Sequence, residues 1–165
     1  MGARAGWKRP LELKRASRFG ITGRVFLIRK SERSVEEIKI EFRRVVRRLG
    51  FVYVGLHDMK DFLMKKGHHI EGEYLVFEFS HPKSLRSAWQ FFPATLSLSP
   101  ARVAAYTQGG QTFLTIMSSR SISAAIIRAN RFRGKVAATL KAVGNRHELK
   151  LRKLLDLLAR RGRGA

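Results

Sequence analysis

One amphipathic helix near the start of the chain constrains the fold more than any other segment. Ser34 and Glu37 have the spacing of a capping box, and Gly50 is a typical stop after a last turn. Arginines fill the final turns, where cations oppose the negative end of the helix dipole. The apolar residues between these signals recur at helical spacing on one face: Val35, Ile38, Phe42, Val45, Val46 and Leu49.

The segments around this helix predict a β-sheet. Apolar, β-branched and aromatic runs indicate strands at 23–29, 51–57, 74–79, 102–106 and 112–117, and Gly109-Gly110 suits the tip of a hairpin between the last two. Short helices are expected at 59–66, capped by Asp58, and at 83–91, after Pro82. The expected class is α+β: a compact domain with a mainly antiparallel sheet of four to five strands and packed helices.

The final third of the chain is expected to be helical. Residues 121–132 and 136–143 have helical patterns, separated by a break at Gly134, and Gly144 is expected to end the second helix. Asn145 and Glu148 suggest a further capping box before a leucine-rich stripe. That stripe is expected to pack on the protein's own core, although it also suits a partner-binding helix.

The charge is distributed very unevenly. The chain of 165 residues holds 34 Lys+Arg and 12 Asp+Glu, a net charge of +22. Residues 1–34 hold ten basic and two acidic residues. Residues 35–119 hold eleven basic and eight acidic residues, and residues 120–165 hold thirteen basic and two acidic residues. We therefore divide the chain into a basic N-terminal arm at 1–21, an α+β core domain at 22–119 and a basic helical C-terminal extension at 120–165.

The core resembles domain-of-unknown-function family 302, a family of small α/β domains. Each shared feature is short, and their order and spacing over about residues 22–119 carry the resemblance. The matching features are Ser34-Val-Glu-Glu37, Leu49-Gly-Phe51, Asp58 before Gly67, His81-Pro82 after the third strand, and Pro100-Ala-Arg-Val103 leading into the hairpin with Gly109-Gly110.

The resemblance implies a compact α+β domain, often a homodimer, with no agreed activity and no catalytic residues to transfer. Two features depart from the family pattern. Members are expected to be near neutral and to lack long basic ends, and some have a cysteine where this chain has His81. The basic ends suggest a core recruited for another task.

Nucleic-acid binding is the function that the basic ends favour. Arginine outnumbers lysine, 22 to 12, and guanidinium suits bidentate contact with phosphate. Aromatic residues beside cations can stack on unpaired bases. The alternatives are solvated arms whose aromatics pack on the core, or a helix at 146–161 lying on an anionic membrane. The expected contacts are Arg4, Trp7, Lys8, Arg9, Lys14, Arg15, Arg18, Phe19, Arg128, Arg131, Phe132, Arg133, Lys135, Arg160, Arg161 and Arg163.

Catalytic and metal-site patterns do not emerge from the sequence. It contains no cysteine, which excludes disulfides and thiolate-held metals, and no P-loop or G-x-S-x-G motif. His68, His69 and His81 with Asp58 could form a metal site, but their spacing matches no known motif. We expect no enzymatic activity, metal or cofactor.

The sequence therefore predicts a non-catalytic RNA-binding protein, a component of a large ribonucleoprotein such as the ribosome. Ribosomal RNA and neighbouring ribosomal proteins are the expected partners, with homodimerisation of the core as a further possibility. We expect a cytoplasmic protein with no membrane partner, because no apolar run is long enough to span a bilayer and the start lacks a secretory signal. Scarce asparagine and abundant arginine hint at a thermophile. The alternatives are a DNA-binding chromatin or regulatory protein, and a dimeric ligand-binding or enzymatic domain.

Overall fold

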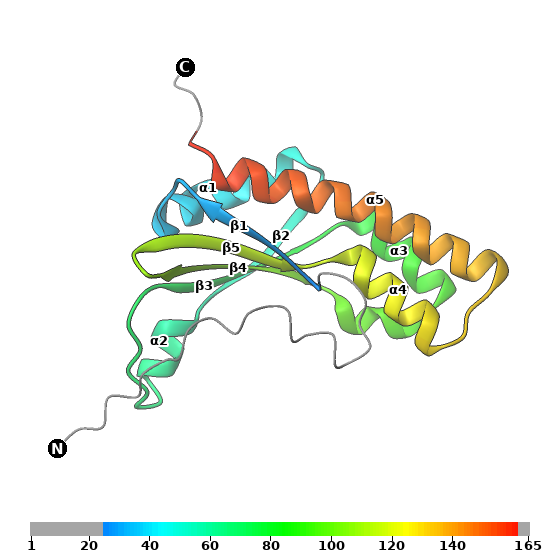
Figure 1. Ribbon diagram of the computed structural model, residues 1–165, viewed down its shortest axis with the longest axis horizontal. Helices are drawn as coiled ribbons and strands as arrows, with labels where there is room; N and C mark the ends of the chain where they lie inside the picture. The colour runs from blue at the N-terminus through cyan, green and yellow to red at the C-terminus, as the bar shows by residue number, and fades with distance from the viewer. Residues whose placement is uncertain (1–24, 162–165) are drawn as a thin grey trace.

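The computed structural model describes residues 25–161, which form one sheet with helices packed against it (Figure 1). The strands are β1 (Phe26–Ser31), β2 (Val52–Asp58), β3 (Tyr74–Ser80), β4 (Ala101–Gln108) and β5 (Gln111–Met117). The helices are α1 (Val35–Arg48), α2 (Met59–Met64), α3 (Pro82–Phe91), the 3-10 helix η2 (Pro93–Leu98), α4 (Ser119–Ala129) and α5 (Gly134–Ala159).

The five strands lie in the order β1-β5-β4-β3-β2, and every neighbouring pair is antiparallel. The predicted hairpin joins β4 to β5, with Gln108 opposite Gln111 across the two glycines. The predicted α+β class is therefore confirmed. Residues 23 and 24 of the predicted first strand lie outside the described residues, β1 is described from Phe26, and η2 was not predicted.

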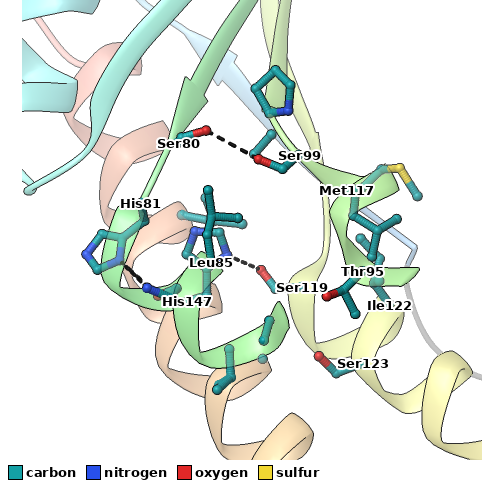
Figure 2. A pocket seen from close by; sticks show the side chains of 18 of the residues that line it. Ser80, His81, Leu85, Thr95, Ser99, Met117, Ser119, Ile122, Ser123 and His147 are labelled. Atoms are coloured by element: carbon teal, nitrogen blue, oxygen red, sulfur yellow. Dashed lines mark hydrogen bonds between the residues drawn. The ribbon is translucent and has the colours of Figure 1, made fainter. Parts of the chain in front are cut away.

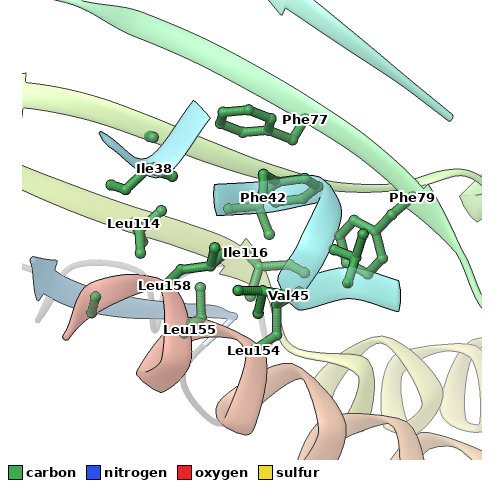
Figure 3. Packing of buried hydrophobic residues seen from close by; sticks show 14 of the residues in the cluster. Ile38, Phe42, Val45, Phe77, Phe79, Leu114, Ile116, Leu154, Leu155 and Leu158 are labelled. Carbon is green, nitrogen blue, oxygen red and sulfur yellow. The ribbon is translucent and has the colours of Figure 1, made fainter. Parts of the chain in front are cut away.

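The core lies between the sheet and the pair α1 and α5, which cover the same face (Figures 1 and 3). Phe42 of α1 stacks on Phe77 of β3 with ring centroids 4.2 Å apart. Leu154 and Leu158 of α5 are fully buried in the same cluster. The leucine stripe thus packs on the protein's own core, as predicted, so α5 completes the domain.

The predicted cap of α1 is confirmed. Ser34 Oγ accepts a hydrogen bond from the Glu37 backbone N–H at 3.1 Å, and Glu37 Oε2 accepts one from the Ser34 N–H at 2.7 Å. Asp58 likewise caps α2 by accepting from the Asp61 N–H at 2.9 Å. These local signals satisfy the free N–H groups at each helix start, which is why they can be recognised in sequence.

The expected helix end at Gly144 is wrong, because α5 runs unbroken through this residue. Gly144 is buried where α5 crosses α4. A Cβ at this position would lie 2.8 Å from Ser123 Cβ and 3.0 Å from the Ser119 carbonyl oxygen. Glycine is thus present to let two helices approach closely, and this benefit offsets its low helix propensity.

The expected capping box of Asn145 with Glu148 is also wrong. Glu148 is only 1% exposed, and its carboxylate accepts a hydrogen bond from Ser118 Oγ at 3.0 Å and pairs with Arg152 at 2.9 Å. Ser118 is the N-cap of α4. The carboxylate therefore links the start of α4 to the middle of α5 instead of starting a new helix.

The sheet face opposite α1 and α5 carries exposed apolar side chains. Phe26 and Met117 are opposite each other on β1 and β5 and are 47% and 45% exposed, and Ile28 is 44% exposed. They alternate along the strands with buried residues such as Leu27 and Ile116, as expected for a sheet with one covered face. No helix in residues 25–161 is long and apolar enough to cross a membrane.

Candidate functional sites

Nine of the predicted nucleic-acid contacts lie outside the described residues, and their prediction rests on sequence alone. The remaining seven fall at the two ends of α5. The residues outside the described range are Arg4, Trp7, Lys8, Arg9, Lys14, Arg15, Arg18, Phe19 and Arg163.

The first group of described contacts lies at the turn between α4 and α5. Arg128, Arg131, Arg133 and Lys135 are all exposed there. Phe132 is half-buried, and its ring packs edge-on against Phe92 with centroids 5.1 Å apart. This turn therefore presents four cations, while its aromatic ring is engaged in packing.

The second group, Arg160 and Arg161, lies at the opposite end of α5 in a groove of about 630 Å³. Arg161 pairs with Glu37 at 3.2 Å, and the Arg160 carbonyl oxygen accepts a hydrogen bond from Arg33 Nε at 2.7 Å. Figure 1 shows that the length of α5 separates this end from the α4–α5 turn. The structure therefore divides the predicted C-terminal site in two. The groove is lined by Glu32, Arg33, Arg44, Val45, Arg48, Asp156, Leu157, Arg160 and Arg161.

A line of cations on the outer side of α5 joins the two groups. Lys135, Arg146 and Lys153, followed by Arg160 at the C-cap, are spaced by eleven, seven and seven residues, close to whole helical turns. All four are exposed, and none forms an ion pair within residues 25–161. We call these four residues the α5 stripe. It spans about 38 Å, at 1.5 Å per residue.

A separate site is a cavity of about 270 Å³ at the end of the sheet (Figure 2). Its wall comes from the ends of β3, β4 and β5, from α3 and the segment after it, and from α4 and α5. Most of the wall is apolar, as at Leu85, Ile122 and Leu140, and several serine residues lie among these apolar side chains. The close crossing of α4 and α5 at Gly144 forms part of this wall.

His147 lies at the polar end of this cavity. Its Nδ1 is 3.2 Å from Ser119 Oγ, while its Nε2 is buried and has no hydrogen-bond partner among the described residues. Burial, together with the nearby His81 and Lys150, lowers the pKa of His147 to about 4. The ring is therefore neutral at pH 7 and leaves one buried polar atom unsatisfied.

His81 lies beside it, with ring centroids 6.3 Å apart. Lys150 Nζ is 2.7 Å from His81 Nε2, and Ser84 Oγ is 2.9 Å from His81 Nδ1. Desolvation and the Lys150 charge lower the pKa of His81. The Ser84 backbone N–H also donates a hydrogen bond to His81 Nδ1 at 3.2 Å, so this ring caps the start of α3.

The Ser119–His147 pair differs from an activated serine nucleophile. A serine nucleophile needs a basic histidine that a third group orients. His147 has a pKa of about 4, and no carboxylate orients its Nε2 among the described residues. No group of three or more His, Asp or Glu within residues 25–161 is arranged to hold a metal ion.

The sequence did not predict this cavity. Its wall comes from seven elements that are spread along the chain, and its residues are common in cores. The one local signal was His81-Pro82 after the third strand. The α5 stripe could have been found from its spacing if α5 had been recognised as one continuous helix.

The fold is that of a small α+β domain with two helices on one face of an antiparallel sheet. The chain belongs to the family described as "Domain of unknown function DUF302", whose model matches residues 27–147. This match confirms the resemblance and extends it beyond residue 119 into α4 and the first half of α5.

A solved relative has the same fold. The crystal structure of an uncharacterized conserved DUF302 protein from Bacillus stearothermophilus matches with a TM-score of 0.71 and 14% sequence identity, covering 84% of this chain and 100% of that one. At this identity the likeness concerns the fold alone. No curated protein matches the chain.

Proposed function

We propose that this protein binds nucleic acid, RNA foremost, as a non-catalytic component of a large ribonucleoprotein such as the ribosome. The α5 stripe is the observation that carries the proposal. Cations without acidic partners can contact phosphates directly, whereas paired cations must first break an existing ion pair. The stripe also connects the cations of the α4–α5 turn with the groove at Arg160 and Arg161.

The remaining charge supports the same proposal. Residues 25–161 hold 26 Lys+Arg against 11 Asp+Glu, so the described part is itself strongly basic. A compact monomer carrying that excess is destabilised by self-repulsion, and a polyanion relieves it. Residues 1–21 would add phosphate contacts and the aromatic residues Trp7 and Phe19. Such a component would act in the cytoplasm.

Neutralising the stripe tests this proposal. We expect Arg146→Gln with Lys153→Gln to weaken binding of a labelled single-stranded RNA, measured by fluorescence anisotropy over a series of KCl concentrations. The slope of log K against log[KCl] should become shallower by about 0.7 per removed contact. The matched control is Lys60→Gln in α2 with Lys66→Gln in the turn after it, a region that Figure 1 shows away from α5. Equal losses from both pairs would contradict a role for the stripe.

The biological context needs a separate experiment. Extract from the native source is fractionated on a density gradient at low and at high salt. We expect the protein to co-migrate with ribosomal particles at low salt and to separate from them at high salt. Migration as a free small protein at low salt would contradict the ribonucleoprotein proposal. Tighter binding of duplex DNA than of RNA in the anisotropy assay would favour the DNA alternative.

We also propose that the core forms a homodimer. The exposed side chains of Phe26, Ile28 and Met117 on the uncovered sheet face support this. Sedimentation equilibrium of the full chain would show a dimer that Ile28→Glu dissociates, and a monomer at all concentrations would contradict it.

A further inference from the structure

The cavity at the end of the sheet has features that nucleic-acid binding does not use. It lies between α3, α4 and α5, away from the solvent-facing side of α5 that carries the stripe. Its volume of about 270 Å³ approaches the size range of small-molecule sites. A cavity of about 150 Å³ accepts benzene, so this one has room for roughly eight to twelve non-hydrogen atoms.

The charge around the cavity favours an anionic head group. No Asp or Glu is among the described residues that line it. Arg102 lines it but pairs with Glu78 at 2.8 Å, so the cation beside the histidines is Lys150, whose Nζ is 2.7 Å from His81 Nε2. The buried carboxylate nearby, Glu148, is already engaged by Ser118 and Arg152.

Hydrogen-bond donors converge on the same end. Ser84 lies in the first turn of α3 and Ser119 at the start of α4, so the positive ends of two helix dipoles lie beside the histidines, with His81 and Ser118 as their caps. The dashed contact of Ser119 with His147 faces the cavity in Figure 2. Ser123 also lines the cavity. A neutral apolar guest would leave the buried His147 Nε2 unsatisfied, as it is among the described residues.

We propose that this cavity binds a small organic acid, with its apolar body against the walls of α3, α4 and α5 and its carboxylate at the end formed by His81, His147 and Ser119. The apolar wall supplies affinity through the area that it buries. The donors and the Lys150 charge supply selectivity for the carboxylate. This binding activity is independent of the proposed nucleic-acid function.

Octanoate and 1-octanol are a matched pair of probes for this cavity, because they share an alkyl chain and differ in head-group charge. Both are titrated into the full-length protein by isothermal titration calorimetry at pH 7.5. We expect one octanoate per chain, bound about tenfold more tightly than octanol, since hydrogen bonds to a charged group exceed neutral ones by about this much. Equal affinities, or no octanoate binding, would overturn the proposal.

Two alanine-to-phenylalanine variants locate the site. Ala88→Phe places a ring in the cavity, while Ala142→Phe adds the same ring to the exposed side of α5. Octanoate binding should fall at least tenfold in the first and stay within about twofold in the second. Unchanged binding in the first, or equal loss in both, would overturn the assignment. Circular dichroism checks folding, and Leu98→Trp, at a lining residue that is 45% exposed, serves as a second filler if Ala88→Phe unfolds.

Head-group recognition is tested by Lys150→Met, which keeps the aliphatic stem and removes the charge. Octanoate should lose most of its advantage over octanol, while octanol binding stays unchanged. An undiminished advantage would remove Lys150 from the site and overturn the carboxylate assignment. Arg146→Gln with Lys153→Gln should leave octanoate binding intact, and its loss there would mean that octanoate binds the basic surface instead.

Discussion

At the residue scale, Gly144 shows how one atom controls the packing of two helices. Ala is normally a better helix residue than Gly by about 0.5–1 kcal/mol. At this crossing, however, the added methyl group would meet Ser123 and the Ser119 carbonyl oxygen. We expect Gly144→Ala to destabilise the protein by about 1–3 kcal/mol, the usual cost of overpacking, in urea denaturation.

A double-mutant cycle isolates this contact. Ser123→Gly removes the side chain that the new methyl group meets. The combined variant Ser123→Gly with Gly144→Ala should therefore be more stable than the sum of the two single effects. Simple additivity would show that the close approach does not govern Gly144.

His147 should make the protein acid-sensitive. Its pKa is about 4 in the folded protein and near 6.5 when unfolded. Between these values the unfolded state binds more protons, so the stability contributed by the neutral ring is lost as pH falls from about 6.5 to 4. We expect a loss of about 2–3 kcal/mol from this residue between pH 7 and pH 4, at 1.36 kcal/mol per pKa unit.

The variant His147→Gln separates this effect from that of the carboxylates. Glu37 and Glu78 also have lowered pKa values, through hydrogen bonds from Ser34 and Arg102 respectively. Their protonation in acid destabilises the wild type and the variant alike. Urea denaturation at pH 7 and pH 4 should show a smaller loss in the variant. NMR titration of His147 gives its pKa directly, and a value near 6.5 would refute the prediction.

Residue roles were predictable where the partner lies within one turn of helix. Ser34 with Glu37 and Asp58 with Asp61 are local pairs, so their spacing was sufficient. Gly144 and Glu148 were misassigned because their partners, Ser123 and Ser118, lie on another helix. A glycine that ends a helix and a glycine that admits a neighbouring helix have the same signature in a single sequence.

At the element scale, α5 has an inner face that closes the core and an outer face open to solvent. Leu154 is fully buried, whereas Leu149 on the same helix is 65% exposed. We expect Leu154→Ala to cost about 3 kcal/mol, because it leaves a cavity between α5, α1 and the sheet. Leu149→Ala should change the free energy of unfolding by less than about 0.5 kcal/mol. Similar effects in urea denaturation would mean that α5 docks differently.

Most elements were predictable because their patterns are strong. The five strands, α1 and the two-glycine hairpin are marked by periodicity and turn residues. The 3-10 helix η2 was missed because six residues beginning at Pro93 have too few turns to show a period. The cavity that η2 helps to close was missed with it.

At the scale of the whole molecule, the excess of positive charge should make stability depend on ionic strength. Like charges repel across the folded surface, and salt screens them over a Debye length of about 10 Å at 0.1 M. We therefore expect Tm to rise between 20 and 300 mM NaCl, in contrast to a protein held together by surface ion pairs. A falling Tm in calorimetry would show that pairs such as Arg29 with Asp156 outweigh the repulsion.

The burial of α5 along its inner face fixes the distances between the charged residues on its outer face. Because the helix cannot flex without disturbing the core, the spacings of about 16, 10 and 10 Å between successive stripe residues are built into the fold. A flexible single-stranded nucleic acid can adjust the distances between its phosphates to match these spacings. A rigid anion can match them only if its charges already have the same spacing. In the proposed nucleic-acid function, the stripe would therefore select among anions by the distance between their charges, with no base being read.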